Sequence, residues 1–278
     1  MKRYLVYMIS LVHVTAVFGQ STANGYQTDS VGHFSISQIQ LDNWETGGES
    51  SLNWQINIQS GMKNERKTIS ESHEISLSFG NSKTGSLPSR KSLDEINLES
   101  VIRLKTKNRF LPYVSIKMQT QFAPGYQYEG TVSKKVSGSM DPVYVTESTG
   151  LTRQLFNRLN MRLGLAMKQT FTTHFHVLYT DDPDTPDIEK SKFEYGLEWV
   201  GDYRKNVNEF STVTMKIELF SNLAAVRRTD VRWDGNYTTQ ISDFIDIGFN
   251  FQLIYDEDIS HKRQIRQFLA IGISYTFR

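Results

Sequence analysis

The last third of the chain alternates between apolar and polar residues, and this constrains the fold more than any other sequence feature. From Ile245 to Tyr255, an isoleucine, phenylalanine, leucine or tyrosine occupies every second position, and mostly polar residues stand between them. The same period returns between Ile265 and Phe277 after a short polar segment. A period of two places one set of residues on each face of a β-strand. The sequence therefore ends in two long predicted strands, each with one apolar face.

Strands of roughly ten residues with this pattern are typical of transmembrane β-barrels, in which the apolar face contacts lipid and the polar face lines the interior. Alternation and turn residues together predict about twelve strands. We therefore expect an all-β fold, a single antiparallel transmembrane β-barrel. The expected strands lie near residues 33–42, 50–62, 71–80, 93–106, 111–122, 153–168, 171–180, 192–204, 209–221, 229–241, 243–256 and 264–277. In the first of these, Phe34 and Ile36 are out of phase with Ile39 and Leu41, which predicts a bulge or a break in pairing.

The expected connections alternate in length, which gives the barrel an orientation. Transmembrane barrels have short periplasmic turns and longer extracellular loops. The expected short turns are 63–67, 107–109, 169–170, 205–208 and 242, and the expected extracellular loops are 43–49, 81–92, 123–152, 181–191, 222–228 and 257–263. Both chain ends are then expected on the periplasmic side. The stretch 126–152 is long enough to contain a further hairpin.

The N-terminus predicts export. Lys2 and Arg3 precede an apolar run from Tyr4 to Phe18, which is typical of a signal peptide ending at Gly19. We expect a signal peptide at 1–19, a short periplasmic segment at 20–32 and the barrel domain at 33–278, with the protein in the cell outer membrane. The chain contains no cysteine, which excludes a lipid-anchored lipoprotein and a disulfide framework.

The overall charge excludes one class of partner. The chain has 31 basic and 30 acidic side chains, and this balance lacks the basic excess typical of nucleic-acid-binding proteins. We expect no nucleic-acid partner. The expected partners are outer-membrane lipid and lipopolysaccharide, the barrel-assembly machinery during biogenesis, and other envelope proteins.

The face predicted to line the barrel carries charges of both signs. Such a set can form a salt-bridge network inside the barrel, or it can line a selective pore. A lining selective for one class of ion is more often biased to one sign, so the sequence favours the network. The lumen charges singled out on these strands are Arg103, Arg162, Glu198, Glu218, Arg232, Asp246 and Arg266.

Two histidines raise the question of metal binding or catalysis. His174 and His176 share one face of the expected strand 171–180, on the lumen side, and a two-residue spacing suits metal ligation. No third ligand or nucleophile stands out, so we expect no metal, no cofactor and no enzyme active site. The acidic segment with Asp181, Asp182 and Asp187 has oxygen ligands suited to Ca²⁺ but lacks EF-hand spacing, and a solvated loop is the simpler interpretation.

Three segments resemble a family of Bacteroidota outer-membrane β-barrel proteins that is known only as a domain of unknown function. They are Gln38–Ser50 (QIQLDNWETGGES), Thr120–Tyr126 (TQFAPGY) and Gln252–Ile259 (QLIYDEDI). The resemblance implies a barrel in a Gram-negative outer membrane and no specific activity. The motif residues expected at the extracellular rim are Asn43, Trp44, Gly47, Gly48, Pro124, Gly125 and Tyr126. Three roles are open: these residues could fold the loops against the rim, or Trp44 and Tyr126 could plug the barrel mouth or bind sugar. The glycines and the proline are residues typical of turns, which favours the first role.

Three functions are compatible with the sequence. The favoured one is an integral outer-membrane protein that acts as a structural or accessory component of the membrane or of an envelope complex. The alternatives are a small diffusion channel or transporter for small solutes, and a barrel hydrolase that uses His174 and His176.

Overall fold

The protein is a closed antiparallel β-barrel of twelve strands. The computed structural model describes residues 25–41, 48–129, 132–156, 158–182, 185–224, 228–257 and 260–277. The predicted single barrel is thus confirmed, including its strand number. The expected signal peptide lies outside the described residues.

The strands follow each other around the wall in chain order, and the last strand closes the ring against the first. The ring order is β1-β14-β13-β12-β11-β10-β9-β8-β5-β4-β3-β2. The wall strands are β1 (Tyr26–Ile39), β2 (Ser51–Glu65), β3 (Ile69–Thr84), β4 (Arg90–Leu104), β5 (Leu111–Thr120), β8 (Val143–Leu155), β9 (Leu159–Phe171), β10 (Ser191–Asn206), β11 (Ser211–Asn222), β12 (Thr229–Gln240), β13 (Ile245–Asp256) and β14 (Ser260–Phe277). A separate hairpin of β6 (Gly125–Glu129) and β7 (Val132–Ser137) and the short helix α1 (His176–Tyr179) belong to two of the connections.

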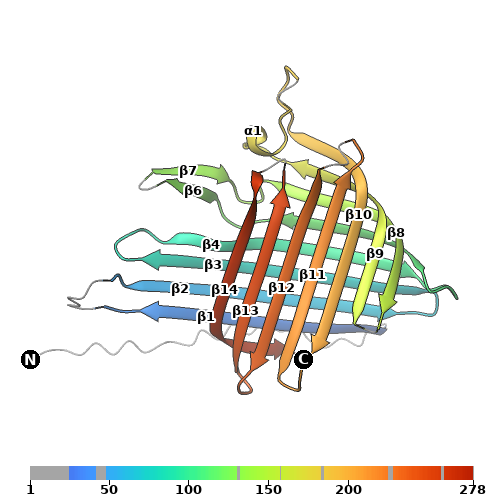
Figure 1. Ribbon diagram of the computed structural model, residues 1–278, viewed down its shortest axis with the longest axis horizontal. Coiled ribbons are helices and arrows are strands. Elements are labelled where there is room, and N and C mark those ends of the chain that lie inside the picture. The colour runs from blue at the N-terminus through green and yellow to red at the C-terminus, as the bar shows by residue number, and fades with distance from the viewer. Residues whose placement is uncertain are drawn as a thin grey trace, which may run out of the picture.

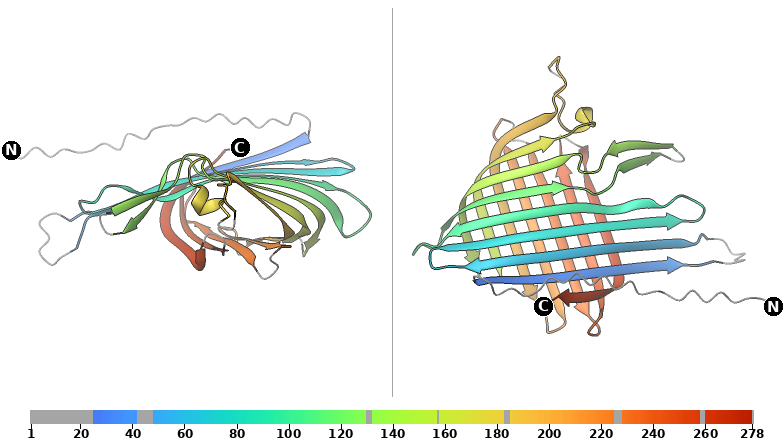
Figure 2. Two further views of the ribbon diagram at one scale, coloured as in Figure 1. Left: turned by 90° about the horizontal axis from the view of Figure 1, so that it is seen from above. Right: turned by 180° about the vertical axis from the view of Figure 1, so that it is seen from behind.

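The two halves of the wall cross each other at a steep angle. Strands β10 to β14 form one side, and β1 to β4 pass behind them in a nearly perpendicular direction (Figures 1 and 2). Strands of a closed barrel tilt by roughly 35–45° to its axis, so facing strands cross at about twice that angle. The hairpin β6-β7 extends away from the wall beside β4 (Figure 1).

The polarity of the barrel is that of a transmembrane barrel, with apolar side chains outside and polar side chains inside. In the terminal hairpin the outward residues Leu269 and Ile271 are 69% and 63% exposed. The alternate residues Asp246 and Gln252 are only 2% and 8% exposed, because they point into the lumen. The alternation that opened the sequence analysis therefore has the predicted orientation. Among the described helical residues, none forms a helix that is both long and apolar enough to span a membrane.

The connections sort into two ends, as expected, but the expected turn at 169–170 is wrong. These two residues belong to β9, and the connection from β8 to β9 falls inside the expected strand 153–168. Turns at 66–68, 105–110, 156–158, 207–210 and 241–244 lie at the end where β1 begins and β14 ends. The connections at the opposite end occupy 40–50, 85–89, 121–142, 172–190, 223–228 and 257–259. The expected long loops at 81–92 and 257–263 are shorter than predicted, because β3, β4 and β14 extend into them.

One predicted strand is wrong, and one real strand was missed. Residues 171–180 were expected to form a strand, but β9 ends at Phe171 and α1 follows. The strand paired between β5 and β9 is β8, and all but its last three residues lie within the expected loop 123–152. The two errors cancel in the strand count. The hairpin suspected within 126–152 is real, since most of β6 and all of β7 lie there.

The first strand also differs from the prediction. β1 begins at Tyr26, so residues 26–32 of the expected periplasmic segment are part of the wall. No register shift interrupts its pairing with β2 from Tyr26 to Ile39, and the predicted bulge is therefore wrong. The change of phase coincides instead with the end of the strand, because Ile39 is its last residue.

Candidate functional site

Ion pairs cross the middle of the lumen. Glu99 on β4 contacts the Arg162 guanidinium on β9 at 2.5 Å and the Lys216 ammonium on β11 at 2.5 Å. Lys216 lies 3.3 Å from Glu218, which also pairs with Lys117 on β5. The side chains of Glu99 and Glu218 are 13% and 14% exposed. Charge-assisted contacts of this kind are among the strongest hydrogen bonds in proteins.

A second cluster joins the most distant strands of the ring. Glu95 on β4 contacts Arg232 on β12 at 3.0 Å and Arg266 on β14 at 3.0 Å. Arg232 also binds Asp234 at 2.7 Å, and the Gln252 amide donates a hydrogen bond to Asp234 at 2.7 Å. Strands β4 and β12 are six places apart in the ring of twelve. Opposite sides of the barrel are therefore tied together directly by side chains.

Two further contacts lie toward the ends of the lumen. Near the loop end, Lys168 binds Asp230 at 2.6 Å and Asp256 at 3.0 Å. Near the closing seam, His33 on β1 lies 3.4 Å from Asp246 on β13. This contact reaches across β14, where Gly272 has no side chain to block it: a Cβ there would lie 3.3 Å from the Asp246 carboxylate.

The most buried apolar residues are small in number and also lie inside the barrel. Val200 is 1% exposed, Tyr113 is 3% exposed, and Val101 and Phe220 are buried as well. Gly150 on β8 pairs with Gly164 on β9. Gly164 leaves room for the Tyr113 hydroxyl, because a Cβ at position 164 would lie 2.7 Å from that hydroxyl oxygen. Ion pairs therefore cross the lumen, and a few buried apolar side chains lie beside them.

Most of the lumen charges predicted from the sequence take part in these contacts. Arg162, Glu218, Arg232 and Arg266 all form ion pairs inside the barrel, and Asp246 lies 3.4 Å from His33. Arg103 on β4 and Glu198 on β10 lie on the same inner face and are half-buried. The sequence reading missed Glu95, although Glu95 has the phase of Glu99 on the same strand, and it missed the role of Lys168.

At the loop end, one carboxylate fixes the connection between β9 and β10. Asp141 is 5% exposed and accepts hydrogen bonds from the Thr172 hydroxyl at 2.5 Å and from the Thr173 and His174 backbone N–H groups, each at 3.1 Å. The Tyr179 hydroxyl donates a hydrogen bond to the Val136 carbonyl at 3.1 Å. Two connections far apart in the sequence therefore pack together as a cap at the loop end of the barrel, which we define as residues 136–142 and 172–180.

The cap electrostatics follow from these contacts. Burial alone raises the pKa of Asp141, but the hydrogen bonds from Thr172, Thr173 and His174 favour the ionised carboxylate and hold its pKa below the ordinary value of 3.8. Burial raises the pKa of the Tyr179 phenol. At neutral pH the cap therefore contains an ionised Asp141 and a neutral Tyr179.

The two histidines do not lie on a wall strand as predicted. His174 lies in the cap, its side chain is 76% exposed, and its Nδ1 is 3.3 Å from Asp141. His176 begins α1. The expected strand would have placed both on one wall of the lumen, and the hydrolase hypothesis depended on that placement. Within the described part of the chain, no three His, Cys, Asp or Glu side chains come together as a metal-binding group.

The structure describes only some of the predicted rim residues. Asn43, Trp44 and Gly47 lie outside the described residues. Gly48 has a φ of +120°, which favours glycine. Pro124 precedes β6, and Gly125 and Tyr126 begin it; Tyr126 is 45% exposed and lies 6.3 Å from the Tyr128 ring. Gly125 and Tyr126 therefore belong to the hairpin that extends away from the wall beside β4, and Pro124 leads into it (Figure 1).

The sequence is similar to one described family. A family model for proteins of unknown function, DUF3078, matches residues 36–126. The match spans two of the segments that carry the resemblance, Gln38–Ser50 and Thr120–Tyr126. It covers the wall from the end of β1 to β5 and the start of the β6-β7 hairpin. No curated protein matches the chain.

Several solved structures are similar in outline. An outer membrane channel from Pseudomonas putida F1 is 9% identical with a TM-score of 0.39, over 91% of this chain and 94% of that chain. The translocator domain of the autotransporter NalP from Neisseria meningitidis is 9% identical with a TM-score of 0.38, over 91% of this chain and 88% of that chain. The KdgM porin in complex with oligogalacturonate is 9% identical with a TM-score of 0.35, over 90% of this chain and 99% of that chain. The fold described above rests on the strand pairing and not on these similarities.

Proposed function

We propose that the protein is an integral outer-membrane β-barrel that acts as a structural or accessory component of the envelope, with its lumen closed by its own side chains. The observation that carries this proposal is the pair of carboxylates on β4, Glu95 and Glu99, which bind cations on β9, β11, β12 and β14. These contacts cross the space through which a solute would pass. The apolar outer face supports the membrane location.

We also propose how the protein reaches the membrane and which bacteria it comes from. The apolar run at Tyr4–Phe18 supports export through a signal peptide, and the segments at Gln38–Ser50 and Thr120–Tyr126 support a Bacteroidota origin. Lipopolysaccharide, the barrel-assembly machinery and other envelope proteins are the proposed partners. A small diffusion channel is the second candidate, and the polar character of the lumen favours it, since a charged interior admits water once the ion pairs part.

Planar-bilayer conductance of the purified protein separates the two candidates. We expect the wild-type protein to show no stable openings, and the double variant Glu95→Gln/Glu99→Gln to conduct because the ties across the lumen are lost. Each protein is first checked for the folded electrophoretic mobility of an unheated barrel. Steady wild-type conductance overturns the closed-lumen proposal and supports the channel.

Pull-down of the native protein from outer membranes tests the accessory role directly. A reproducible set of envelope partners supports this role, whereas a barrel recovered alone contradicts it.

A further inference from the structure

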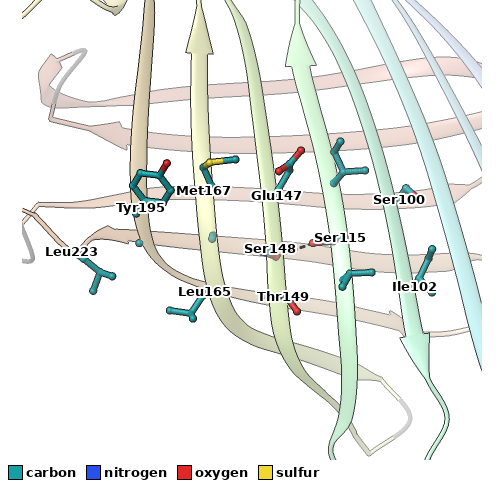
Figure 3. Close-up of a pocket in the computed structure, with 14 residues that line it drawn as sticks. Ser100, Ile102, Ser115, Glu147, Ser148, Thr149, Leu165, Met167, Tyr195 and Leu223 are labelled. Atoms are coloured by element: carbon teal, nitrogen blue, oxygen red, sulfur yellow. Dashed lines mark hydrogen bonds between the residues drawn. The ribbon is translucent and has the colours of Figure 1, made fainter.

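The outer wall contains a groove at the level where lipid surrounds the barrel. It has a volume of about 660 Å³ and lies over β4, β5, β8, β9 and β10 (Figure 3). Its apolar lining includes Ile102, Val114, Ile116, Leu165, Met167 and Tyr195. A volume of this size is in the range of sites that hold one small ligand, which is roughly 300–1,000 Å³.

Glu147 is the one charged residue among those that line the groove, which also include Ser100, Ser115, Ser148 and Thr149. Its register partners are Ile116 on β5 and Met167 on β9, and both belong to the outer face. Glu147 is exposed, and Figure 3 shows its carboxylate beside Met167, within the groove. In the part of the chain that the structure describes, Glu147 forms no hydrogen bond and no ion pair. A carboxylate on the lipid face of a barrel is unfavourable unless something compensates its charge.

The depth of Glu147 in the wall indicates what can reach it. It is the fifth residue of β8, counted from the loop end at Val143. Four residues of strand rise roughly 13 Å, and a tilt near 45° reduces this to about 10 Å of depth. We place the membrane surface at the loop end of the wall strands, which puts Glu147 close to the boundary between lipid headgroups and acyl chains. A headgroup can therefore reach Glu147 while its chains follow the wall.

We propose that this groove binds a single membrane lipid that carries a primary amine, with the ammonium group on Glu147 and an acyl chain along Ile116, Leu165 and Met167. A primary ammonium supplies three N–H donors to the carboxylate, whereas a quaternary ammonium supplies none. A symmetric pair of copies meeting at the groove would bring two Glu147 carboxylates together, which disfavours dimerisation there.

Lipid retention from vesicles of defined composition tests the inference. The protein is reconstituted in vesicles made of equal amounts of phosphatidylethanolamine and phosphatidylglycerol. It is then extracted from the vesicles in a mild detergent, and the lipids that stay bound are counted by native mass spectrometry. We expect the wild-type protein to retain phosphatidylethanolamine in preference, and Glu147→Gln to reduce that preference about tenfold, because one charge-assisted hydrogen bond is lost. Leu165→Trp, which fills the groove without changing the carboxylate, is expected to reduce retention of the same lipid.

Glu71→Gln is the matched control. Glu71 is another outward-facing carboxylate, but it lies at the turn end of β3 and accepts hydrogen bonds from Tyr26 and Asn64. Its variant is expected to retain lipid as the wild-type protein does. The inference is overturned if the wild-type protein retains both lipids equally, or if Glu71→Gln also loses the preference. It is also overturned if Glu147→Gln loses a protein partner instead of a lipid. Failure of the protein to insert into vesicles contradicts the proposed membrane location instead.

Discussion

Replacing Glu99 by glutamine is the sharpest test of the ion-pair network. Glu99 joins Arg162 on β9 to Lys216 on β11, with both contacts at 2.5 Å. Glutamine has nearly the same shape but no charge, so Glu99→Gln leaves two cations in the lumen without their shared partner. The lost free energy therefore measures the electrostatic contribution of the network and not a change in packing.

The expected magnitude follows from burial. Removing one partner of a buried ion pair costs about 3–5 kcal/mol, because the other charge stays buried without compensation. Glu99 is 13% exposed, and Lys216 retains Glu218 at 3.3 Å. Both facts reduce the cost, so we expect the free energy of unfolding to fall by about 3 kcal/mol, the lower end of that range.

Unfolding by guanidinium chloride in lipid vesicles, followed by the fluorescence of the four tryptophans, measures this change. Glu74→Gln is the matched control, because Glu74 pairs in register with Glu99 on the adjacent strand but is exposed. That variant is expected to change stability by less than about 0.5 kcal/mol. If Glu99→Gln loses less than about 1 kcal/mol, which is the value of an exposed pair, the lumen is hydrated and the reasoning is refuted.

Three further predictions concern the cap, the wall and the orientation. Asp141→Asn is expected to expose the cap to protease at neutral pH. In the wild-type protein the ionised Asp141 carboxylate stabilises the cap at any pH above its ordinary pKa of 3.8. This stabilisation is lost as the pH falls through the lowered pKa that Asp141 has in the folded protein. Gly164→Ala is expected to destabilise the barrel by about 1–3 kcal/mol, seen as a lower temperature of mobility change on electrophoresis, because a Cβ meets the Thr149 carbonyl. The chain has no cysteine, so single cysteines can be placed at either end of the barrel. A membrane-impermeant maleimide added to whole cells is expected to label Val132→Cys in the β6-β7 hairpin and not Val207→Cys in a turn. The reverse labelling would show that the turn end of the barrel faces outward.

Alternation predicted the wall well where the outward face is apolar throughout, as in β13 and β14. It failed for β8 because the outward face of that strand includes Glu147, Thr149 and Arg153, which weaken the pattern. The opposite error arose at 171–180, where the residues alternate but do not form a strand. Asp141 accepts the backbone N–H groups of Thr173 and His174, and these contacts turn the chain away from the wall. A contact with a residue thirty positions away leaves no local sequence signal.

The inner charges were predictable as a set, because their phase on each strand follows from the apolar face. Their partners were not, since Glu95 and Arg232 come together only through the closure of the ring. Which side chains meet across a lumen depends on how the strand registers are staggered around the barrel, and a single strand does not determine this stagger. The groove on the outer wall was unpredictable for a related reason, because it draws its lining from five strands.

The ring closes through a short ladder. β1 pairs with β14 over six residues, Ser30–Ser35 against Gly272–Phe277, whereas it pairs with β2 over fourteen. The two partners at this seam are the first and the last strand of the wall, so the ring cannot close until β14 has been synthesised. Bringing such distant segments together is slow, although the entropy of a long loop grows only with the logarithm of its length. The seam is thus the natural last step of assembly, and a partially assembled barrel presents β1 and β14 as free edges to whatever chaperone or insertion machinery receives it.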